Sequence, residues 1–183
     1  MTDRLIDPYG ITLNLGDPMI RLFVPGRPIP KGSLAVGHTK TGKVFLRHST
    51  DAGDLKTWTK TVATLGRLVM QRAHLQPVAE QAFFVYWTFI RNRPLAHRRA
   101  DGTVKPQYAR LLPLTRPDVD KLHRATADAL EGIVWADDAQ LTTVIACKRW
   151  GRMEGAQADV YRDYSDPDVE TPANLHELIG RVM

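Results

Sequence analysis

The stretch "RPDVDKLHRATADALEGIVWADDAQLTTVIACKRW", residues 116–150, predicts a helix followed by a β-strand, and this pair decides the expected fold. Pro117 suits the start of a helix but not its interior, so the helix begins near Asp118. At about 100° per residue, Leu122, Thr126 and Leu130 fall on one face, which we expect to pack inward. Gly132 suits the end of the helix. Residues 140–150 are rich in β-branched side chains and predict a strand.

Similar patterns elsewhere in the chain predict the remaining elements. Apolar residues recur at steps of three and four over residues 51–72 and indicate an amphipathic helix. Strands are expected at residues 20–25, 43–48 and 82–90. The order β-β-α-β-α-β predicts an α/β (α+β) fold with a single mixed sheet and helices packed on it.

The domain is expected to span residues 20–152. Residues 1–19 form an N-terminal extension in this interpretation, and residues 153–183 form an acidic C-terminal tail with a short helix at 173–182. The single cysteine, Cys147, excludes an intramolecular disulfide framework, and we expect it to be buried and inert. No apolar run approaches the roughly 20 residues that span a bilayer, and no signal peptide is evident. We therefore expect a cytoplasmic protein without a membrane partner.

The chain is basic overall but contains one acidic segment. Its formal net charge is +5, and residues 1–117 hold 18 Lys and Arg against 7 Asp and Glu. Between positions 118 and 138, only Lys121 and Arg124 offset six acids. These acids are Asp118, Asp120, Asp128, Glu131, Asp137 and Asp138. A basic body favours a polyanionic partner such as nucleic acid, although a merely solubilising surface is the alternative.

The residues that could contact DNA are basic and lie outside the expected core. Residues 91–115 show no periodicity and predict a long basic loop. The candidates are Lys31, Arg91, Arg93, Arg98, Arg99, Lys105 and Lys121, each of which could instead be solvated surface. Trp135 could stack on a base, but an aromatic residue at this place is more often part of the core.

The acids of the segment suggest a metal site. If the chain returns as a strand beside the helix start, one of Asp137 and Asp138 meets Asp118 and Asp120, because neighbouring strand side chains point to opposite faces. Converging carboxylates repel one another, and a divalent cation such as Mg²⁺ resolves that conflict. Structural alternatives remain: Asp118 as a helix cap and Asp120 as a partner of Arg124. Asp128 and Glu131 could belong to a solvated face.

The arrangement P-D-x-D-x-L-x-[KR]-A-x-x-D-A-L, then G, then W-x-D-D-x-Q, resembles the RusA-type Holliday-junction resolvases. It appears here as "PDVDKLHRATADALEGIVWADDAQ", and "FVPGRPIPKGS" at residues 23–33 is similar to the first strand and loop of that family. The resemblance covers residues 20–150. It implies a small homodimer that binds four-way DNA junctions and makes paired, symmetric nicks with Mg²⁺, Mn²⁺ being an alternative ion. It also implies a bacterial or phage-infected host cell and no small-molecule cofactor.

Carried over by position, the resemblance makes Asp118, Asp120 and Asp138 the catalytic, metal-binding carboxylates. Asp128 and Asp137 would support the site. Two positions depart from the family pattern. Lys121 stands where asparagine is common, and Arg124 stands where the functional lysine usually sits. Arginine can grip a phosphate with two donors but cannot give up a proton, so Arg124 keeps a charge-stabilising catalytic role and no proton-transfer role.

Two other functions compete with the nuclease. The first is a non-catalytic or weakly catalytic junction-binding or architectural protein on the same fold, which the substitutions at Lys121 and Arg124 favour. The second is a metal-dependent hydrolase of small phosphates, which the absence of a Gly-rich phosphate loop disfavours.

Overall fold

A computed structural model describes residues 5–6, 12–13, 17–32, 34–38, 41, 43–48 and 52–163. Its centre is a four-stranded sheet in the order β3-β8-β6-β7. The four strands are β3 (Ile20–Pro25), β6 (Ala82–Asn92), β7 (Leu141–Gly151) and β8 (Gly155–Asp163). β6 and β7 are parallel, whereas β8 pairs antiparallel with both β3 and β6. The sheet is therefore mixed, as the sequence predicts.

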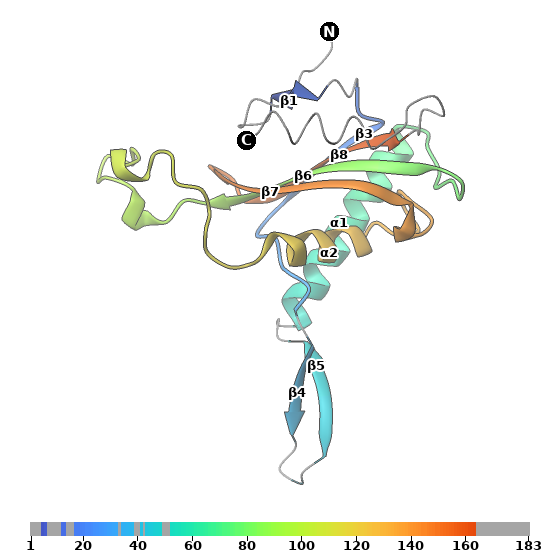
Figure 1. Cartoon of the computed structure of the whole chain (residues 1–183), viewed down its shortest axis with the longest axis horizontal. Coiled ribbons are helices and arrows are strands. Elements are labelled where there is room, and N and C mark those ends of the chain that lie inside the picture. The colour runs from blue at the N-terminus through green and yellow to red at the C-terminus, as the bar shows by residue number, and fades with distance from the viewer. Residues whose placement is uncertain are drawn as a thin grey trace, which may run out of the picture.

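Two helices cover one face of this sheet. Helix α1 (Ala52–Arg72) packs on β3, and helix α2 (Val119–Asp128) packs under β6 and β7 (Figure 1). Two further antiparallel pairs stand apart from the main sheet: β1 (Leu5–Ile6) with β2 (Thr12–Leu13), and β4 (Leu34–His38) with β5 (Val44–His48). The strand predicted at 43–48 exists as β5, but it forms a hairpin with β4 instead of joining the main sheet. The helices among the described residues include none long and apolar enough to cross a membrane.

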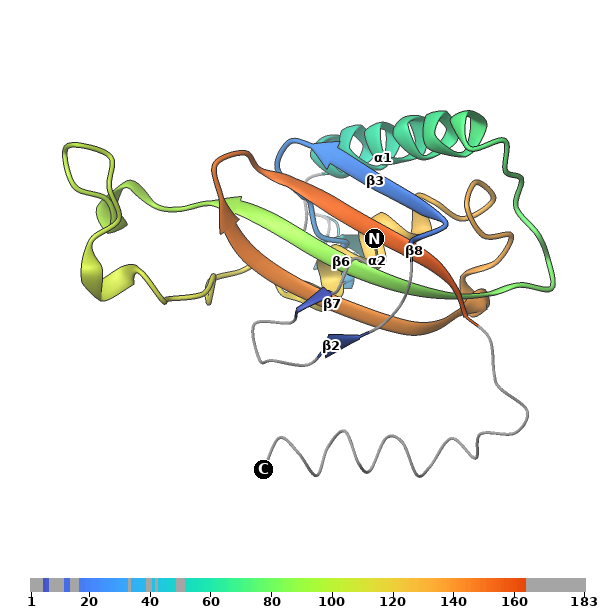
Figure 2. The ribbon, with the colours of Figure 1, turned by 90° about the horizontal axis from the view of Figure 1, so that it is seen from above.

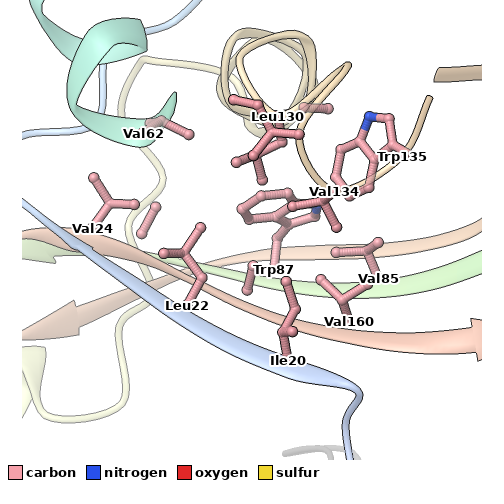
Figure 3. Close-up of a cluster of buried hydrophobic side chains, with 14 of the residues drawn as sticks. Ile20, Leu22, Val24, Val62, Val85, Trp87, Leu130, Val134, Trp135 and Val160 are labelled. Atoms are coloured by element: carbon pink, nitrogen blue, oxygen red, sulfur yellow. The ribbon is translucent and has the colours of Figure 1, made fainter. Parts of the chain in front are cut away.

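The core lies between the helices and the sheet. Trp87 projects from β6 into a cluster that includes Leu22, Val62 and Leu130 (Figure 3). Trp135 is fully buried, and its ring lies 6.3 Å from that of Phe83. Trp135 is therefore a core residue and is not available to stack on a base. Each such large apolar side chain contributes about 1.5–3 kcal/mol by leaving water.

Helix α2 has the inward face that its periodicity predicts. Leu122 and Thr126 are fully buried, and Trp58 of α1 donates a hydrogen bond from Nε1 to Thr126 Oγ1 at 3.4 Å. The expectation that Gly132 caps this helix is wrong, because the helix ends earlier, at a cap on Ala129. Gly132 has φ +69° and makes the following turn instead, where its N–H donates to the carbonyl of Trp135 at 2.7 Å.

The position of β8 in the main sheet shows that the domain boundary expected at residue 152 is wrong. Residues 155–163, expected in an acidic tail, lie between β3 and β6 inside the sheet. Ala156, Ala158 and Val160 of β8 are fully buried in the core. The domain therefore extends through Asp163. The helix expected at 173–182 lies outside the described residues.

The basic loop predicted at 91–115 is largely confirmed as irregular structure. β6 continues to Asn92, and residues 93–115, which we name the arm, then project beyond the end of the sheet (Figures 1 and 2). The arm contains two short 3₁₀ helices, η1 (Leu95–His97) and η2 (Pro106–Tyr108). A third, η3 (Asp138–Gln140), precedes β7. The arm leads from the end of β6 to the start of α2.

Gly155 should tolerate no side chain. A Cβ atom there would lie 2.7 Å from the carbonyl oxygen of Val24 and 2.6 Å from the ring of Phe23, so the β3–β8 pairing would have to shift. Gly155→Ala should lower the free energy of unfolding by about 1–3 kcal/mol, measured by urea denaturation. Arg162→Ala, at an exposed position of β8, should change it by less than about 0.5 kcal/mol. Equal stability of the two variants would contradict the central place of β8.

Candidate metal-binding site and basic surface

Asp118 and Asp120 lie at the start of α2, and both are exposed. Asp118 is the N-cap residue in an extended conformation, and its carbonyl accepts the first helical hydrogen bond, from Leu122 N at 3.2 Å. Its carboxylate makes no hydrogen bond to the N–H groups of the first helical turn. Asp118 therefore caps the helix through its backbone alone. The positive end of the helix dipole favours both negative charges.

Two cations of the same helix face these carboxylates. Lys121 Nζ donates to Asp118 Oδ2 at 2.8 Å, and Arg124 Nη2 lies 3.9 Å from Asp120 Oδ2. The side chains of Arg124 and Asp120 are 60% and 64% exposed, so this pair contributes no more than about 0.5 kcal/mol to stability. The hydrogen bond and charge of Lys121 hold the pKa of Asp118 below its ordinary value, with smaller contributions from Arg116 and Lys148. Both carboxylates are therefore exposed and already have a cationic partner on the same helix.

Lys148 of β7 is a site residue that the sequence analysis did not identify. Its Nζ donates to the carbonyl oxygens of Thr115 at 2.9 Å and Pro117 at 3.0 Å, which ties the segment before Asp118 to the sheet. Burial lowers the pKa of Lys148, and the charge of Asp118 opposes that shift. The contact joins residues about thirty positions apart, so no local pattern could have revealed it. The lysine within a β-branched strand was the single available signal.

A hollow of about 350 Å³ opens beside Asp118. The loop after β3, Asp54 of α1 and the residues around the start of α2 line it. Its cations are Arg27, Arg116 and Lys121. Lys31, in the same loop, forms an ion pair with Asp128 of α2, and its N–H donates to the carbonyl of Lys121 at 3.0 Å. These bonds hold the loop against α2, and the role of Asp128 in this contact is structural.

Asp137 and Gln140 are used to build the turn before β7. The carboxylate of Asp137 accepts from Ala139 N at 2.8 Å, and Gln140 Oε1 accepts from Asp137 N at 3.0 Å, which forms a capping box. Gln140 Nε2 also donates to the carbonyl of Gln81 at 2.7 Å. The chain returns here as a 3₁₀ turn, so the strand alternation expected for Asp137 and Asp138 is wrong. Asp138 itself is exposed.

The expected convergence of Asp138 with Asp118 and Asp120 does not occur within one chain. Lys148 lies toward the end of β7 near Asp118, whereas Asp138 is the first residue of η3, which directly precedes Leu141 at the other end of that strand. The seven residue steps from Leu141 to Lys148, at about 3.3 Å each, place these two residues roughly 23 Å apart. Figure 1 shows α2 running back along β7, with its start beside the strand's end. Over the described ranges, no three His, Cys, Asp or Glu side chains are grouped closely enough to hold a metal ion.

Most of the candidate DNA-binding cations of the arm also hold the arm's own backbone. Arg98 Nη1 donates to Gly102 O at 2.9 Å, Lys105 Nζ donates to Ala96 O at 2.9 Å, and Arg93 donates to Tyr108 O. Arg91 Nη1 donates to Arg116 O at 3.2 Å. A guanidinium carries five N–H donors, so the arginines keep donors for a further partner. Arg99 is exposed on the arm.

Comparison with known proteins agrees with the resemblance that the acidic motif suggests. The family model described as endodeoxyribonuclease RusA matches residues 25–160, about three quarters of the chain. This range contains α2, β7 and most of β8. Among curated proteins, none matches the chain.

The carboxyl group of Asp118 should titrate below the ordinary aspartate pKa of about 3.9. Because its pKa is depressed in the folded state, the stabilising interaction is complete above that ordinary value and is lost as the pH falls through the lower folded pKa. Lys121→Met should raise the pKa of Asp118, and Lys148→Met should raise it less, as ¹³C NMR titration of the carboxyl carbon would measure. Lys105→Met, on the arm, serves as the unaffected control. An unchanged midpoint in Lys121→Met would refute the assignment.

Proposed function

The chain belongs to the RusA family of endodeoxyribonucleases, and on that premise we propose that it is a Mg²⁺-dependent, structure-selective endonuclease. It resolves four-way DNA junctions by paired, symmetric nicks during recombination and repair, in the cytoplasm of a bacterial or phage-infected cell. The observation that carries this proposal is the pair of exposed carboxylates, Asp118 and Asp120, at a helix start surrounded by cations.

The donor set at the start of α2 fits Mg²⁺, with Mn²⁺ as the alternative. Mg²⁺ usually takes one or two carboxylates, retains several waters and binds substrate phosphate, and Asp118 and Asp120 are exposed enough to permit this. When bound, the ion polarises the phosphate and lowers the pKa of a coordinated water. Lys121 donates to Asp118 Oδ2, so Mg²⁺ would compete with its ammonium for that oxygen.

The remaining residues hold the DNA backbone and the two acids in place. Arg124, one helical turn after Asp120, directs a permanently charged guanidinium toward the site and stabilises negative charge on the phosphate. Arg27 and Arg116, in the hollow beside Asp118, receive a neighbouring phosphate. Lys148 fixes the backbone that carries Asp118 through its two carbonyl contacts.

A second copy of the chain completes the site with Asp138. β7 is an edge strand of the sheet, and Thr142, Thr143 and Val144 are exposed along it, which supports pairing with another strand. Antiparallel pairing of two β7 strands around Val144 would set the start of the partner's strand opposite Cys147. Asp138 of the partner subunit would then lie near Asp118 and Asp120, at the end of β7 where Lys148 lies.

This arrangement also accounts for paired nicks. A two-fold axis through the β7 pair would create two equivalent sites, each with two carboxylates from one protomer and Asp138 of the partner subunit. A four-way junction has the same two-fold symmetry, so each site would meet a strand of the same polarity. The proposal therefore links dimer formation to metal binding.

One contact favours the alternative of a junction-binding protein with little or no cleavage activity. Lys121 neutralises Asp118 through a direct hydrogen bond of 2.8 Å, so the acid already has a partner without any metal. If that ion pair persists in the presence of Mg²⁺, the basic surface would still bind junctions but the site would not cut them.

Asp120→Asn should reduce nicking of a labelled four-way junction to background, because the amide removes a negative ligand without changing the side chain's size. Binding of the same junction, measured by gel shift in EDTA, should remain within about threefold, since the phosphate-binding cations are intact. Asp17→Asn, at an exposed position before β3, is the matched control and should cleave normally. Full activity of Asp120→Asn would reject the site, and inactivity of the wild type in Mg²⁺ and Mn²⁺ would favour the alternative.

Mixing two inactive variants tests the shared site. Asp120→Asn and Asp138→Asn should each fail to cut alone. In a heterodimer, one site carries both changes and the other carries neither, so a refolded equimolar mixture should recover about a quarter of the wild-type sites. The recovered activity should produce single nicks instead of paired ones. No recovery despite heterodimer formation, verified with differently tagged chains, would contradict a site built from two protomers.

A further inference from the structure

A second, larger hollow lies between the arm and the end of β7. Its volume is about 800 Å³, within the range of small-ligand sites. Three arginines line it, Arg93 and Arg98 from the arm and Arg152 from the turn after β7, together with the ring of Trp150. The arm leads from this hollow to the start of α2, where Asp118 is the N-cap residue. Figure 2 shows the arm projecting beyond one end of the sheet.

Arg93 and Trp150 form a cation–π pair in this hollow. The guanidinium carbon of Arg93 lies 5.5 Å from the centroid of the Trp150 ring, and Arg93 also donates to the carbonyl of Tyr108. Trp150 Nε1 donates to the carbonyl of Leu111 at 2.8 Å. His97 stacks on Tyr108 at 4.1 Å and meets the Trp150 ring edge-on. Both planar groups are therefore held in place before any ligand binds.

The charge of the hollow favours an anion. Asp101 is the acid among its lining residues, and its carboxylate accepts from Thr103 N at 2.8 Å and Thr103 Oγ1 at 2.6 Å. These bonds commit Asp101 to the tight turn of the arm and lower its pKa. The hollow therefore contains three guanidinium groups and one carboxylate, and that carboxylate is already hydrogen-bonded within the turn of the arm.

We infer that this hollow binds one unpaired nucleotide extruded at the branch point of the DNA junction. The base stacks against the Arg93–Trp150 pair, and Arg98 and Arg152 contact the flanking phosphates. Guanidinium planes and aromatic rings stack on splayed-out bases, whereas a continuous duplex keeps the faces of its bases stacked inside and offers only phosphates and groove edges. The inference rests on the proposed function and adds to it a physical basis for preferring branched DNA over linear duplex.

The decisive variant is Arg93→Lys, which keeps the positive charge but removes the planar stacking group. Binding is measured with the full chain in EDTA, using a four-way junction with 2-aminopurine at the branch point and a linear duplex of the same sequence. Arg93→Lys should weaken junction binding about 10-fold, leave duplex binding unchanged and reduce the change in 2-aminopurine fluorescence. Arg110→Lys, at an exposed arm position that is neither a lining residue nor a candidate DNA contact, is the matched control and should alter neither affinity.

Trp150→Leu provides a second variant, checked for folding by circular dichroism. It should produce the same selective loss of junction affinity. Equal weakening of junction and duplex binding in Arg93→Lys, or no weakening of either, would overturn the inference while leaving the nuclease assignment intact. If the wild-type protein itself showed no preference for the junction, the proposed junction specificity would fail first, and the inference would fail with it.

Discussion

The parallel pairing of β6 and β7 fixes where the functional groups of this chain lie. Two parallel strands cannot be joined by a tight hairpin, so residues 93–140 must carry the chain from the end of β6 back to the start of β7. The arm and α2 make up most of this crossover. Because α2 therefore runs opposite to β7, its first residues, Asp118 and Asp120, lie at one end of the strand and Asp138 lies at the other. The separation of these acids is a consequence of the strand pairing.

Much of the fold could be predicted from the sequence because the relevant signals are local. The faces of α1 and α2 follow from apolar spacing, and β6 and β7 follow from runs of β-branched and aromatic residues. β8 could not be predicted from its sequence, because "GAQADVYRD" combines small residues with polar ones. In the sheet, the small residues of β8 pack against the hydrophobic core. Asp159 is buried, and Arg21 of β3 donates from Nε to Asp159 Oδ1 at 2.8 Å. That pairing partner lies 138 positions away, beyond any local pattern.

The candidate site could be predicted only in part, and the reason is again the distance along the chain. The motif identified Asp118, Asp120, Arg124 and the Asp137–Asp138 pair. Their spacing along the chain could not show which of these side chains lie close together in space. The structure assigns the first acid of the pair to a capping box, which leaves Asp138 exposed at the far end of β7. Lys148 could not be found at all from sequence, because its role depends on carbonyl oxygens at the end of the crossover.

The basic residues illustrate how one set of charges can serve both fold and function. An unstructured arm would lose much conformational entropy when it binds DNA, and that loss would reduce affinity. Here Arg93, Arg98 and Lys105 already donate to the arm's carbonyls, so their positions are set before DNA arrives. Such bonds use one donor of each group and leave the charge in place, because carbonyl oxygens do not neutralise it. A preorganised cationic arm beside two exposed carboxylates at the start of α2 is the charge arrangement that the proposed metal-dependent cleavage of DNA requires.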